Sequence, residues 1–250
     1  MYIDTHCHMV KEYYDDMDKY ISNCIDNNVK KIIVNACDKK SCLEVLKLVK
    51  KYDIVYGALG FHPTELDEVS EEEFEWLESV INNDKIVAVG EIGLDYHYDN
   101  TDKDKQKRFF KRQLDIACKY NKPVIVHTRD SIQDTFDILK EYNVKGVIHC
   151  YSGSLEMARE FIKLGYYIGI GGICTFKNAS NIINVIKNID LEYIVLETDS
   201  PYLTPEPYRK YLNESMYIPL ISMKIAVIKG IDEELVMNTT TDSACRIFDF

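Results

Sequence analysis

Short apolar segments alternate with longer amphipathic segments along most of this chain, and this alternation constrains the fold more than any other feature of the sequence. Eight apolar segments are short enough to be strands: residues 2–5, 31–35, 54–59, 86–90, 124–126, 146–148, 167–170 and 193–196. Segments with helical periodicity lie between them, among them residues 41–52, 70–82, 104–120, 131–142 and 154–164. Ser70, Ser131 and Ser154 begin three of these helices, where a serine hydroxyl is favoured as the N-cap.

Eight strands that are each followed by a helical segment predict an α/β fold of the (β/α)8, or TIM-barrel, class rather than an open sheet. Residues 219–230 and 232–248 predict two extra helices after the eighth strand. A length of 250 residues is typical of one such barrel, and no Pro-, Gly- or Ser-rich linker interrupts the chain. We therefore expect a single domain over residues 1–250 with extra C-terminal helices.

The charge of the chain limits its partners. A formal net charge of -11 argues against an extended basic surface that would bind duplex DNA or a membrane. It does not exclude a phosphate substrate, because bound divalent metals can reverse the local field. The first residues, MYIDTHCHMV, do not resemble a signal peptide, and no apolar run approaches the roughly 18 residues of a transmembrane helix. The eight cysteines are scattered without a CxxC pair, so we expect reduced, buried thiols in a cytoplasmic protein.

Five of the six histidines fall at or just after the ends of predicted strands, and only His97 lies deeper in a loop. The reactive groups of a (β/α)8 barrel lie where its strands end. His6 and His8 follow the first strand two residues apart, so both side chains can lie on one face. The other polar residues at strand ends, in chain order, are His62, Glu91, His127, His149 and Asp199.

These polar side chains predict a metal site. A single histidine is more often an ordinary core or surface residue than a ligand, but six suitable side chains at one end of a barrel favour metal binding. The predicted ligands are His6, His8, Glu91, His127, His149 and Asp199. Imidazole with carboxylate suits zinc, manganese or similar ions, and a carboxylate among the histidines can bridge two of them.

Six motifs along the chain resemble, in order, those of the TatD family of metal-dependent deoxyribonucleases in the amidohydrolase superfamily. They are YIDTHCH, GFHP, VGEIGLDY, PVIVHTR, HCYSGS and LETDSPYLTP. The resemblance extends from residue 2 to the C-terminal helices. The chain departs from the family pattern at Asn213-Glu214-Ser215, where the family usually has Asn-Glu-Pro, and this departure changes no predicted ligand.

The resemblance implies two divalent metal ions, which we expect to be magnesium, manganese or zinc. His6, His8 and Asp199 would hold the first ion. His127 and His149 would hold the second, with Glu91 as the bridge between the two.

The implied mechanism follows from the charges of the two ions. Two close metals lower the pKa of a shared water and stabilise charge on the attacking and leaving oxygens. Asp199 can bind a metal and also accept the proton of the water, so Asp199 and Glu91 are the predicted catalytic residues. The leading hypothesis is a phosphodiesterase acting on DNA, a 3′→5′ exonuclease that prefers single-stranded ends. No membrane and no stable protein partner is implied.

Arg129, two residues after His127, is placed to hold a phosphate through its planar guanidinium group. His62 and Tyr96 are further predicted substrate contacts. One alternative keeps the barrel and the metals but hydrolyses an ester or amide, for example as an aminoacyl-tRNA deacylase. Another is a binding protein with a vestigial barrel, which the presence of all six expected ligands disfavours. Cleavage assays on single-stranded oligonucleotide and on a carboxylic ester would separate the enzymatic alternatives.

Overall fold

The computed structural model describes residues 1–250, and the chain divides into two compact units. Unit 1 comprises Met1–Val34 and Cys150–Phe250, and unit 2 comprises Asn35–His149. Eight strands alternate with helices along the two units, as the sequence predicts.

The strands of unit 1 are β1 (Tyr2–Cys7), β2 (Val29–Asn35), β7 (Tyr166–Ile170) and β8 (Ile194–Leu196). β1 pairs in parallel with β2, and β7 pairs in parallel with β8. A parallel bridge between Cys7 and Ser200 connects the end of β1 to the segment after β8. All six residues of β1 are buried, although Asp4, Thr5 and His6 are polar. Buried parallel strands are normally apolar, so these polar side chains need specific partners.

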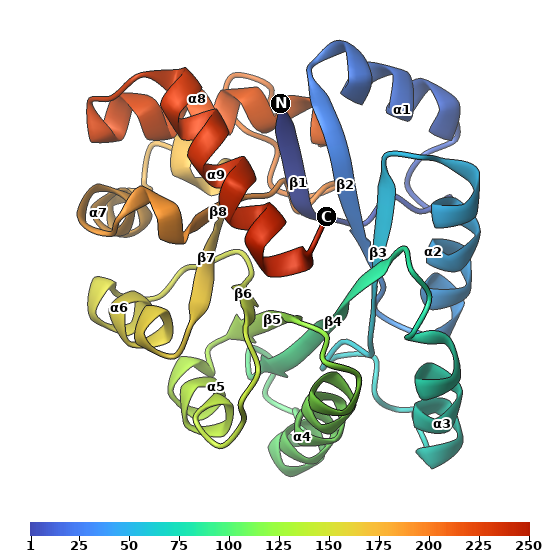
Figure 1. Ribbon diagram of the computed structural model, residues 1–250. Helices are drawn as coiled ribbons and strands as arrows, with labels where there is room; N and C mark the ends of the chain where they lie inside the picture. Colours follow the sequence, from blue (N-terminus) through green and yellow to red (C-terminus); the bar gives the residue numbers. More distant parts are fainter. The chain divides into compact units, whose positions relative to one another are not determined.

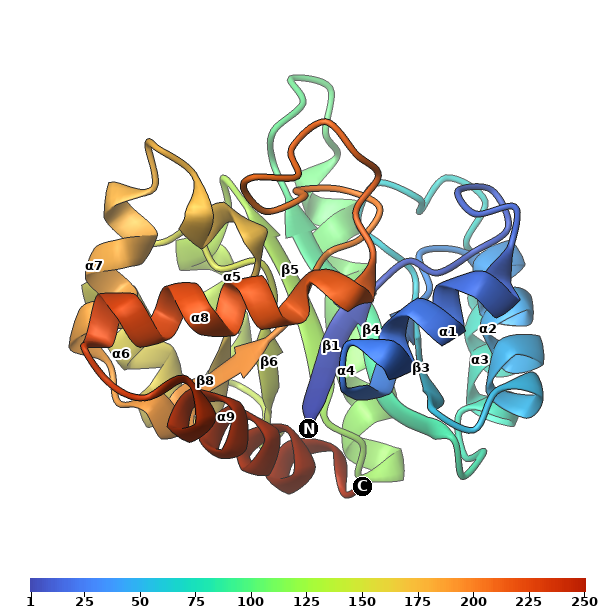
Figure 2. The same cartoon turned by 90° about the horizontal axis from the view of Figure 1, so that it is seen from above.

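The helices of unit 1 are α1 (Met17–Asp26), α6 (Leu155–Lys163), α7 (Ser180–Asn188), α8 (Ile218–Lys229) and α9 (Glu233–Phe248). Three short 3-10 helices accompany them: η1 (Gly172–Thr175), η2 (Leu191–Tyr193) and η3 (Ser215–Tyr217). α9 packs on β8 and β1, and α8 packs on α9 (Figures 1 and 2). The predicted C-terminal helices therefore cover the strands that begin and end this unit.

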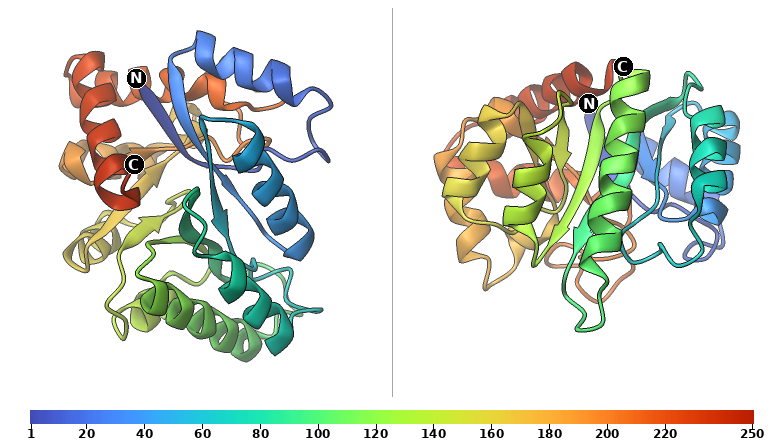
Figure 3. Two further views of the ribbon diagram at one scale, coloured as in Figure 1. Left: turned by 45° about the vertical axis from the view of Figure 1, so that its right-hand side comes forward. Right: turned by 90° about the horizontal axis from the view of Figure 1, so that it is seen from below.

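Unit 2 contains β3 (Val55–Leu59), β4 (Ile86–Asp95), β5 (Val124–Arg129) and β6 (Gly146–Ile148), which pair in parallel in this order. Its helices are α2 (Lys39–Lys51), α3 (Glu71–Val80), α4 (Lys103–Tyr120) and α5 (Ile132–Leu139). α4 packs along β4 (Figure 3). The buried residues of α4 include Phe109, Phe110 and Leu114.

β1, β4 and β5 are longer than predicted. They were expected to end at residues 5, 90 and 126, but they continue to Cys7, Asp95 and Arg129. β4 and β5 stay in register beyond those points, with Gly93 opposite His127 and Asp95 opposite Arg129. The polar residues at the ends of these segments interrupt the apolar pattern in the sequence, but their backbones still pair as strands.

Two of the three predicted serine caps form. Ser70 accepts a hydrogen bond from Glu72 N, and Ser154 accepts one from Met157 N. Ser131 occupies the N-cap position of α5, but its hydroxyl makes no capping bond. It donates instead to the carbonyl of Leu94 at 2.8 Å, which ties the start of α5 to β4.

No helix has both the length and the apolar character needed to cross a membrane. All eight cysteines are free thiols, and four of them are buried: Cys7, Cys24, Cys42 and Cys174. Cys118 is exposed, so the expectation of burial is wrong for that thiol.

Candidate metal centre

His6, His8 and Asp199 come together in unit 1. His6 lies on β1, His8 follows the end of that strand, and Asp199 follows β8. The Nε2 atoms of the two histidines are 3.2 Å apart. Asp199 Oδ1 lies 3.6 Å from His6 Nε2 and 3.5 Å from His8 Nε2. Both rings therefore lie on one face of the extended chain. The bridge between Cys7 and Ser200 brings the Asp199 carboxylate beside them.

The backbone of Asp199 has an uncommon conformation. Its φ angle is 55°, in the left-handed region that non-glycine residues seldom adopt. Asp199 N donates to the His6 carbonyl at 2.9 Å, and its own carbonyl accepts from Tyr202 N at 2.9 Å. Such conformations cost about 1–3 kcal/mol, persist only where the surroundings determine them, and cluster at functional sites. The hydrogen bond to His6 couples this conformation to the strand that carries the histidines.

Asp4 is a buried carboxylate that connects the same two segments. It accepts from His6 N at 3.2 Å, Thr198 N at 3.0 Å, Thr198 Oγ1 at 2.6 Å and Ser215 Oγ at 2.6 Å. Burial raises the pKa of Asp4 to about 7, and the hydrogen bonds from Ser215 and Thr198 oppose that rise. Asp4 was not predicted as a site residue. Its spacing could have indicated a role, because side chains at positions 4, 6 and 8 of an extended chain point to the same face.

In unit 2, three histidines surround the buried carboxylate of Glu91. Glu91 Oε1 lies 2.8 Å from His127 Nδ1, 3.5 Å from His62 Nε2 and 3.8 Å from His149 Nε2. His62, Glu91 and His127 offer ligand atoms that are all within 4.8 Å of one another, close enough to hold a metal ion. His62, which was predicted as a substrate contact, lies closer to Glu91 than the predicted ligand His149 does.

His127 lies between two carboxylates. Its Nδ1 faces Glu91, and its Nε2 is 3.0 Å from Asp95 Oδ2. Burial lowers the pKa of His127, but the hydrogen bonds with Asp95 and Glu91 outweigh that effect and raise it. For Asp95 the signs are reversed: burial raises its pKa, but the hydrogen bond with His127 opposes this effect and the pKa is lowered overall. A carboxylate on the second ring nitrogen is the usual way to orient a metal-binding histidine.

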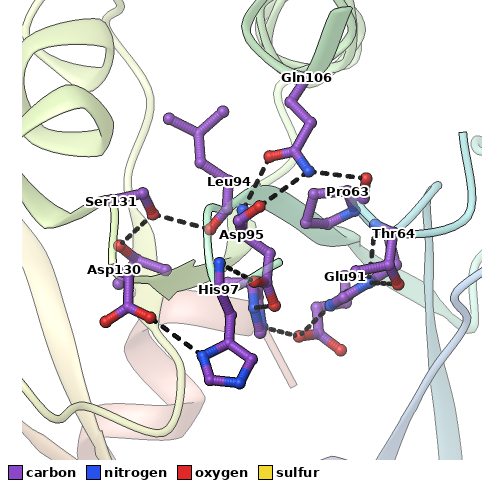
Figure 4. Close-up of polar contacts among 12 residues, drawn as sticks. Pro63, Thr64, Glu91, Leu94, Asp95, His97, Gln106, Asp130 and Ser131 are labelled. Atoms are coloured by element: carbon purple, nitrogen blue, oxygen red, sulfur yellow. Dashed lines mark hydrogen bonds and ion pairs between the residues drawn. The ribbon is translucent and has the colours of Figure 1, made fainter. Parts of the chain in front are cut away.

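Asp95 is itself fixed by the backbone around it. Asp95 N donates to Gln106 Oε1 at 2.8 Å, and Gln106 Nε2 donates to the carbonyls of Asp95 and Pro63 (Figure 4). Asp95 was given no role in the predicted site. Its spacing of four from Glu91 along β4 places both carboxylates on one face of the strand.

Gly93 lies between these two carboxylates and allows β4 to approach β5. Its φ angle is 147°, and a Cβ atom there would lie 2.0 Å from the His127 carbonyl oxygen. No side chain fits at this position without displacing the strand that carries His127.

The predicted substrate contacts lie at the ends of β4 and β5 or in the loops after β3 and β4. Arg129 is exposed, with its guanidinium carbon 6.0 Å from the centre of the Tyr98 ring. Tyr96 donates its hydroxyl to Asp134 Oδ2 at 2.8 Å, so this group is engaged with α5. His97, predicted to lie deeper in a loop, is exposed and pairs with Asp130 at 3.2 Å (Figure 4).

His62 Nδ1 lies 2.8 Å from Thr64 Oγ1 and 3.2 Å from Thr64 N, so Nε2 is the ring nitrogen that faces Glu91. The imidazole nitrogens and carboxylate oxygens of the site fit divalent zinc or manganese.

Comparison with known families and relatives gives one consistent match. The sequence model of the family described as TatD related DNase matches residues 3–249. The chain is also similar to the uncharacterised metal-dependent hydrolase YabD of Bacillus subtilis, with 38% identity over 99% of both chains.

Solved structures of the same kind match along the whole chain. The crystal structure of YjjV, a TatD homologue from Escherichia coli K12, covers 100% of this chain and 98% of its own, with a TM-score of 0.95 and 30% identity. A TatD-family hydrolase from Entamoeba histolytica covers 99% of this chain and 97% of its own, with a TM-score of 0.86 and 25% identity. These matches confirm the predicted fold class, the (β/α)8 barrel, and the predicted family resemblance.

Proposed function

The chain belongs to the family of TatD-related DNases, whose matched relative YabD is named a metal-dependent hydrolase, and from this premise we propose that it hydrolyses phosphodiester bonds in DNA. The observation that carries the proposal is the geometry of the histidines: His6 and His8 meet Asp199, while His62, His127 and His149 meet Glu91. We propose a 3′→5′ exonuclease that prefers single-stranded ends, acting in the cytoplasm.

Two divalent ions, magnesium, manganese or zinc, are proposed as cofactors. His6, His8 and Asp199 would hold one ion, and His127 and His149 the other, with Glu91 serving both. When bound, such ions lower the pKa of water and stabilise the charge that develops on the attacking and leaving oxygens.

Two protein side chains would transfer the proton and orient a ligand. Asp199, fixed by its bond to the His6 carbonyl, is placed to accept the proton of the attacking water. Asp95 orients the His127 ring through Nε2.

Arg129 and His62 are the proposed phosphate contacts. Arg129 is exposed and can present two parallel N–H groups to a phosphate. His62 presents Nε2 beside Glu91. Tyr96 was predicted as a third contact, but its hydroxyl would have to leave Asp134 to reach a phosphate.

The test is a cleavage assay with defined strands. Protein loaded separately with magnesium, manganese or zinc is incubated with a 5′-labelled single-stranded oligonucleotide, with circular single-stranded DNA and with a carboxylic ester such as an aminoacyl ester. We expect a ladder that shortens from the 3′ end and no cutting of the circle. Internal cuts in the circle would show that a free end is not required. No DNA cleavage with any of the metals, together with rapid ester hydrolysis, would favour the alternative ester or amide hydrolase.

A further inference from the structure

The segment between β8 and α8 in unit 1 exposes several aromatic side chains. Tyr202 is 49% exposed, Tyr208 is 40% exposed and Tyr211 is 66% exposed. Figure 2 shows this segment in orange, as a loop that stands away from α8. Aromatic rings contribute most when they are buried, so a group of exposed rings in one loop marks a binding surface. We call Tyr202, Tyr208 and Tyr211 the tyrosine platform.

One end of the tyrosine platform touches the candidate metal centre. The Tyr202 ring lies 6.3 Å from the His8 ring, measured between centroids, in an edge-to-face arrangement. Tyr13 also contacts Tyr202, with ring centroids 5.8 Å apart and hydroxyl oxygens 2.8 Å apart. A half-exposed aromatic ring therefore lies next to a predicted metal ligand.

The other end of the platform is also ordered by ring contacts. The Tyr208 ring stacks on Tyr217 with a centroid distance of 5.1 Å and an interplanar angle of 21°. It also lies 6.2 Å from Tyr211. The stacked contact with Tyr217 therefore orients the partly exposed Tyr208 ring.

The backbone of the segment is fixed by buried hydrogen bonds. Asn213, which is fully buried, donates to the carbonyls of Thr198 at 2.8 Å and Tyr202 at 2.5 Å. Thr204 Oγ1 donates to the Tyr211 carbonyl at 2.8 Å. A surface that is ordered before binding loses less conformational entropy when a ligand arrives.

Two cations lie within the same segment of an otherwise acidic chain. Arg209 and Lys210 are both exposed, between Tyr208 and Tyr211. The Arg209 guanidinium lies 3.9 Å from the Phe176 ring centre and donates to the Thr204 carbonyl at 3.1 Å. Rings that can stack on bases, interleaved with cations that can meet phosphates, form the surface that binds an unpaired nucleic acid strand.

We propose that the tyrosine platform stacks on the bases of a single strand whose end reaches the metal centre, with Tyr202 stacking on the base nearest the scissile bond. The proposal rests on the proposed function and adds a physical reason for the preference for single strands, because the base faces of a duplex are already stacked. Stacking is tolerant of sequence, since every base has a π-face. The platform therefore gives a preference for unpaired bases without a preference for particular bases.

The test compares strands with and without bases. A fluorescent single-stranded oligonucleotide, protected by phosphorothioate linkages at its 3′ end, is titrated with metal-loaded protein and followed by anisotropy. A matched strand carries abasic residues at the 3′ end, so it has the same backbone charge but no ring to stack. The variants are Tyr202→Ala, Tyr202→Phe and Tyr211→Ala. The control is Tyr193→Ala, a partly exposed tyrosine at the opposite, amino end of β8.

Stacking contributes about 1–3 kcal/mol per base, so Tyr202→Ala should weaken binding of the base-bearing strand by roughly 5- to 150-fold. Tyr211→Ala should weaken it by a smaller factor. Tyr202→Phe and Tyr193→Ala should bind as the wild type does. The abasic strand should bind the wild type and Tyr202→Ala equally.

Equal weakening of both strands by Tyr202→Ala would overturn the proposal, because it would indicate a general disturbance of the site. So would equal affinity of the wild-type protein for the two strands. The metal content of Tyr202→Ala, measured by elemental analysis, should match that of the wild type and reports that the centre is intact. If the wild type does not cleave DNA, only the proposed function is contradicted. The stacking proposal is tested separately, because anisotropy measures binding and does not depend on turnover.

Discussion

Asp199 shows most clearly how one residue joins backbone conformation to chemistry. Its φ angle of 55° is one that asparagine adopts about as readily as aspartate, so Asp199→Asn should preserve the backbone and the hydrogen bond to His6. The substitution keeps an oxygen beside His6 and His8 but removes most of its basicity. We expect kcat to fall by about 10²–10⁴-fold while the metal content stays near the wild-type value.

Metal content by elemental analysis and kcat on a single-stranded oligonucleotide check this prediction together. A variant with normal metal content and wild-type kcat would contradict the proton-accepting role. Loss of the metal would show instead that the Asp199 charge is needed for binding.

Ser215 provides a second prediction at the scale of one residue. Ser215 Oγ donates to the buried Asp4 at 2.6 Å, and the Ser215 N–H donates to Tyr20 Oη at 3.0 Å. A proline here would have neither donor. Ser215→Ala leaves a buried carboxylate with one donor fewer and should lower the free energy of unfolding by about 2 kcal/mol.

Urea denaturation of the metal-free protein measures this change, with Ser152→Ala, at an exposed serine, as the control. A change no larger than that of the control would show that water replaces the Ser215 hydroxyl at Asp4.

The site residues that were predicted differ from those that were missed in a physical way. His6, His8 and Asp199 could be found because residue type and strand-end position suffice to suggest a metal ligand. Asp4 bonds to Thr198, the neighbour of Asp199, and Asp95 bonds to His127, and both contacts depend on how strands and loops pack. Nothing in the local pattern specifies such partners, although alternation along β1 and β4 does place both carboxylates on the correct face.

At the scale of elements, all eight strands could be predicted, because buried parallel strands have an apolar pattern that the intervening helices lack. The carboxyl ends of five strands also agree with the prediction, but β1, β4 and β5 extend further than their apolar segments. β4 and β5 continue through polar residues because Gly93 allows the two backbones to approach, a tertiary effect that no apolar pattern records. The error matters for function, because Glu91 and His127 lie within strands β4 and β5 rather than in the loops that follow them.

Helices α3 and α4 are joined by an ion network that makes a prediction about pH. Glu78 on α3 accepts hydrogen bonds from Lys119 and, at 2.9 Å, from Arg112 on α4. The bond from Lys119 holds the pKa of Glu78 below its usual value, burial acts in the opposite direction, and Arg112 lowers it further. A carboxylate with a lowered folded-state pKa adds stability above its unfolded pKa of 4.5, and this stability is lost as the pH falls through the folded value.

We therefore expect Glu78→Gln to lower the free energy of unfolding by about 1 kcal/mol at pH 7, with the difference from wild type shrinking below about pH 4.5. Urea denaturation at a series of pH values checks this. Glu75→Gln, at an exposed position on the same helix, is the matched control. A difference that stays constant down to acid pH would show that the loss is one of packing and not of charge.

At the scale of the whole molecule, the prediction that Glu91 serves two ions can be tested by counting metal. Wild-type protein should contain about two divalent ions per chain. Glu91→Ala should lower the occupancy of both, because a bridging carboxylate binds two ions at once. His97→Ala, which removes an exposed imidazole from the same unit, is the control and should keep both ions. Retention of one full ion in Glu91→Ala would show that Glu91 serves a single site.

The net charge of -11 leads to a final prediction about how the protein holds a polyanion. An acidic surface repels a long strand except where bound metals and a few cations such as Arg129 face it, so only a few phosphates should be neutralised. For single strands, the logarithm of the binding constant falls with the logarithm of salt concentration by about 0.7 per neutralised phosphate. Two or three phosphates give a shallow slope of about -1.4 to -2.1.

Arg129→Ala should make that slope less steep by about 0.7 and leave the metal content unchanged. Arg159→Ala, at an exposed arginine on α6, should change neither. Anisotropy titrations at four or more salt concentrations measure the slope. A steep slope near that of a basic groove, or one unaffected by Arg129→Ala, would show that the strand is held elsewhere.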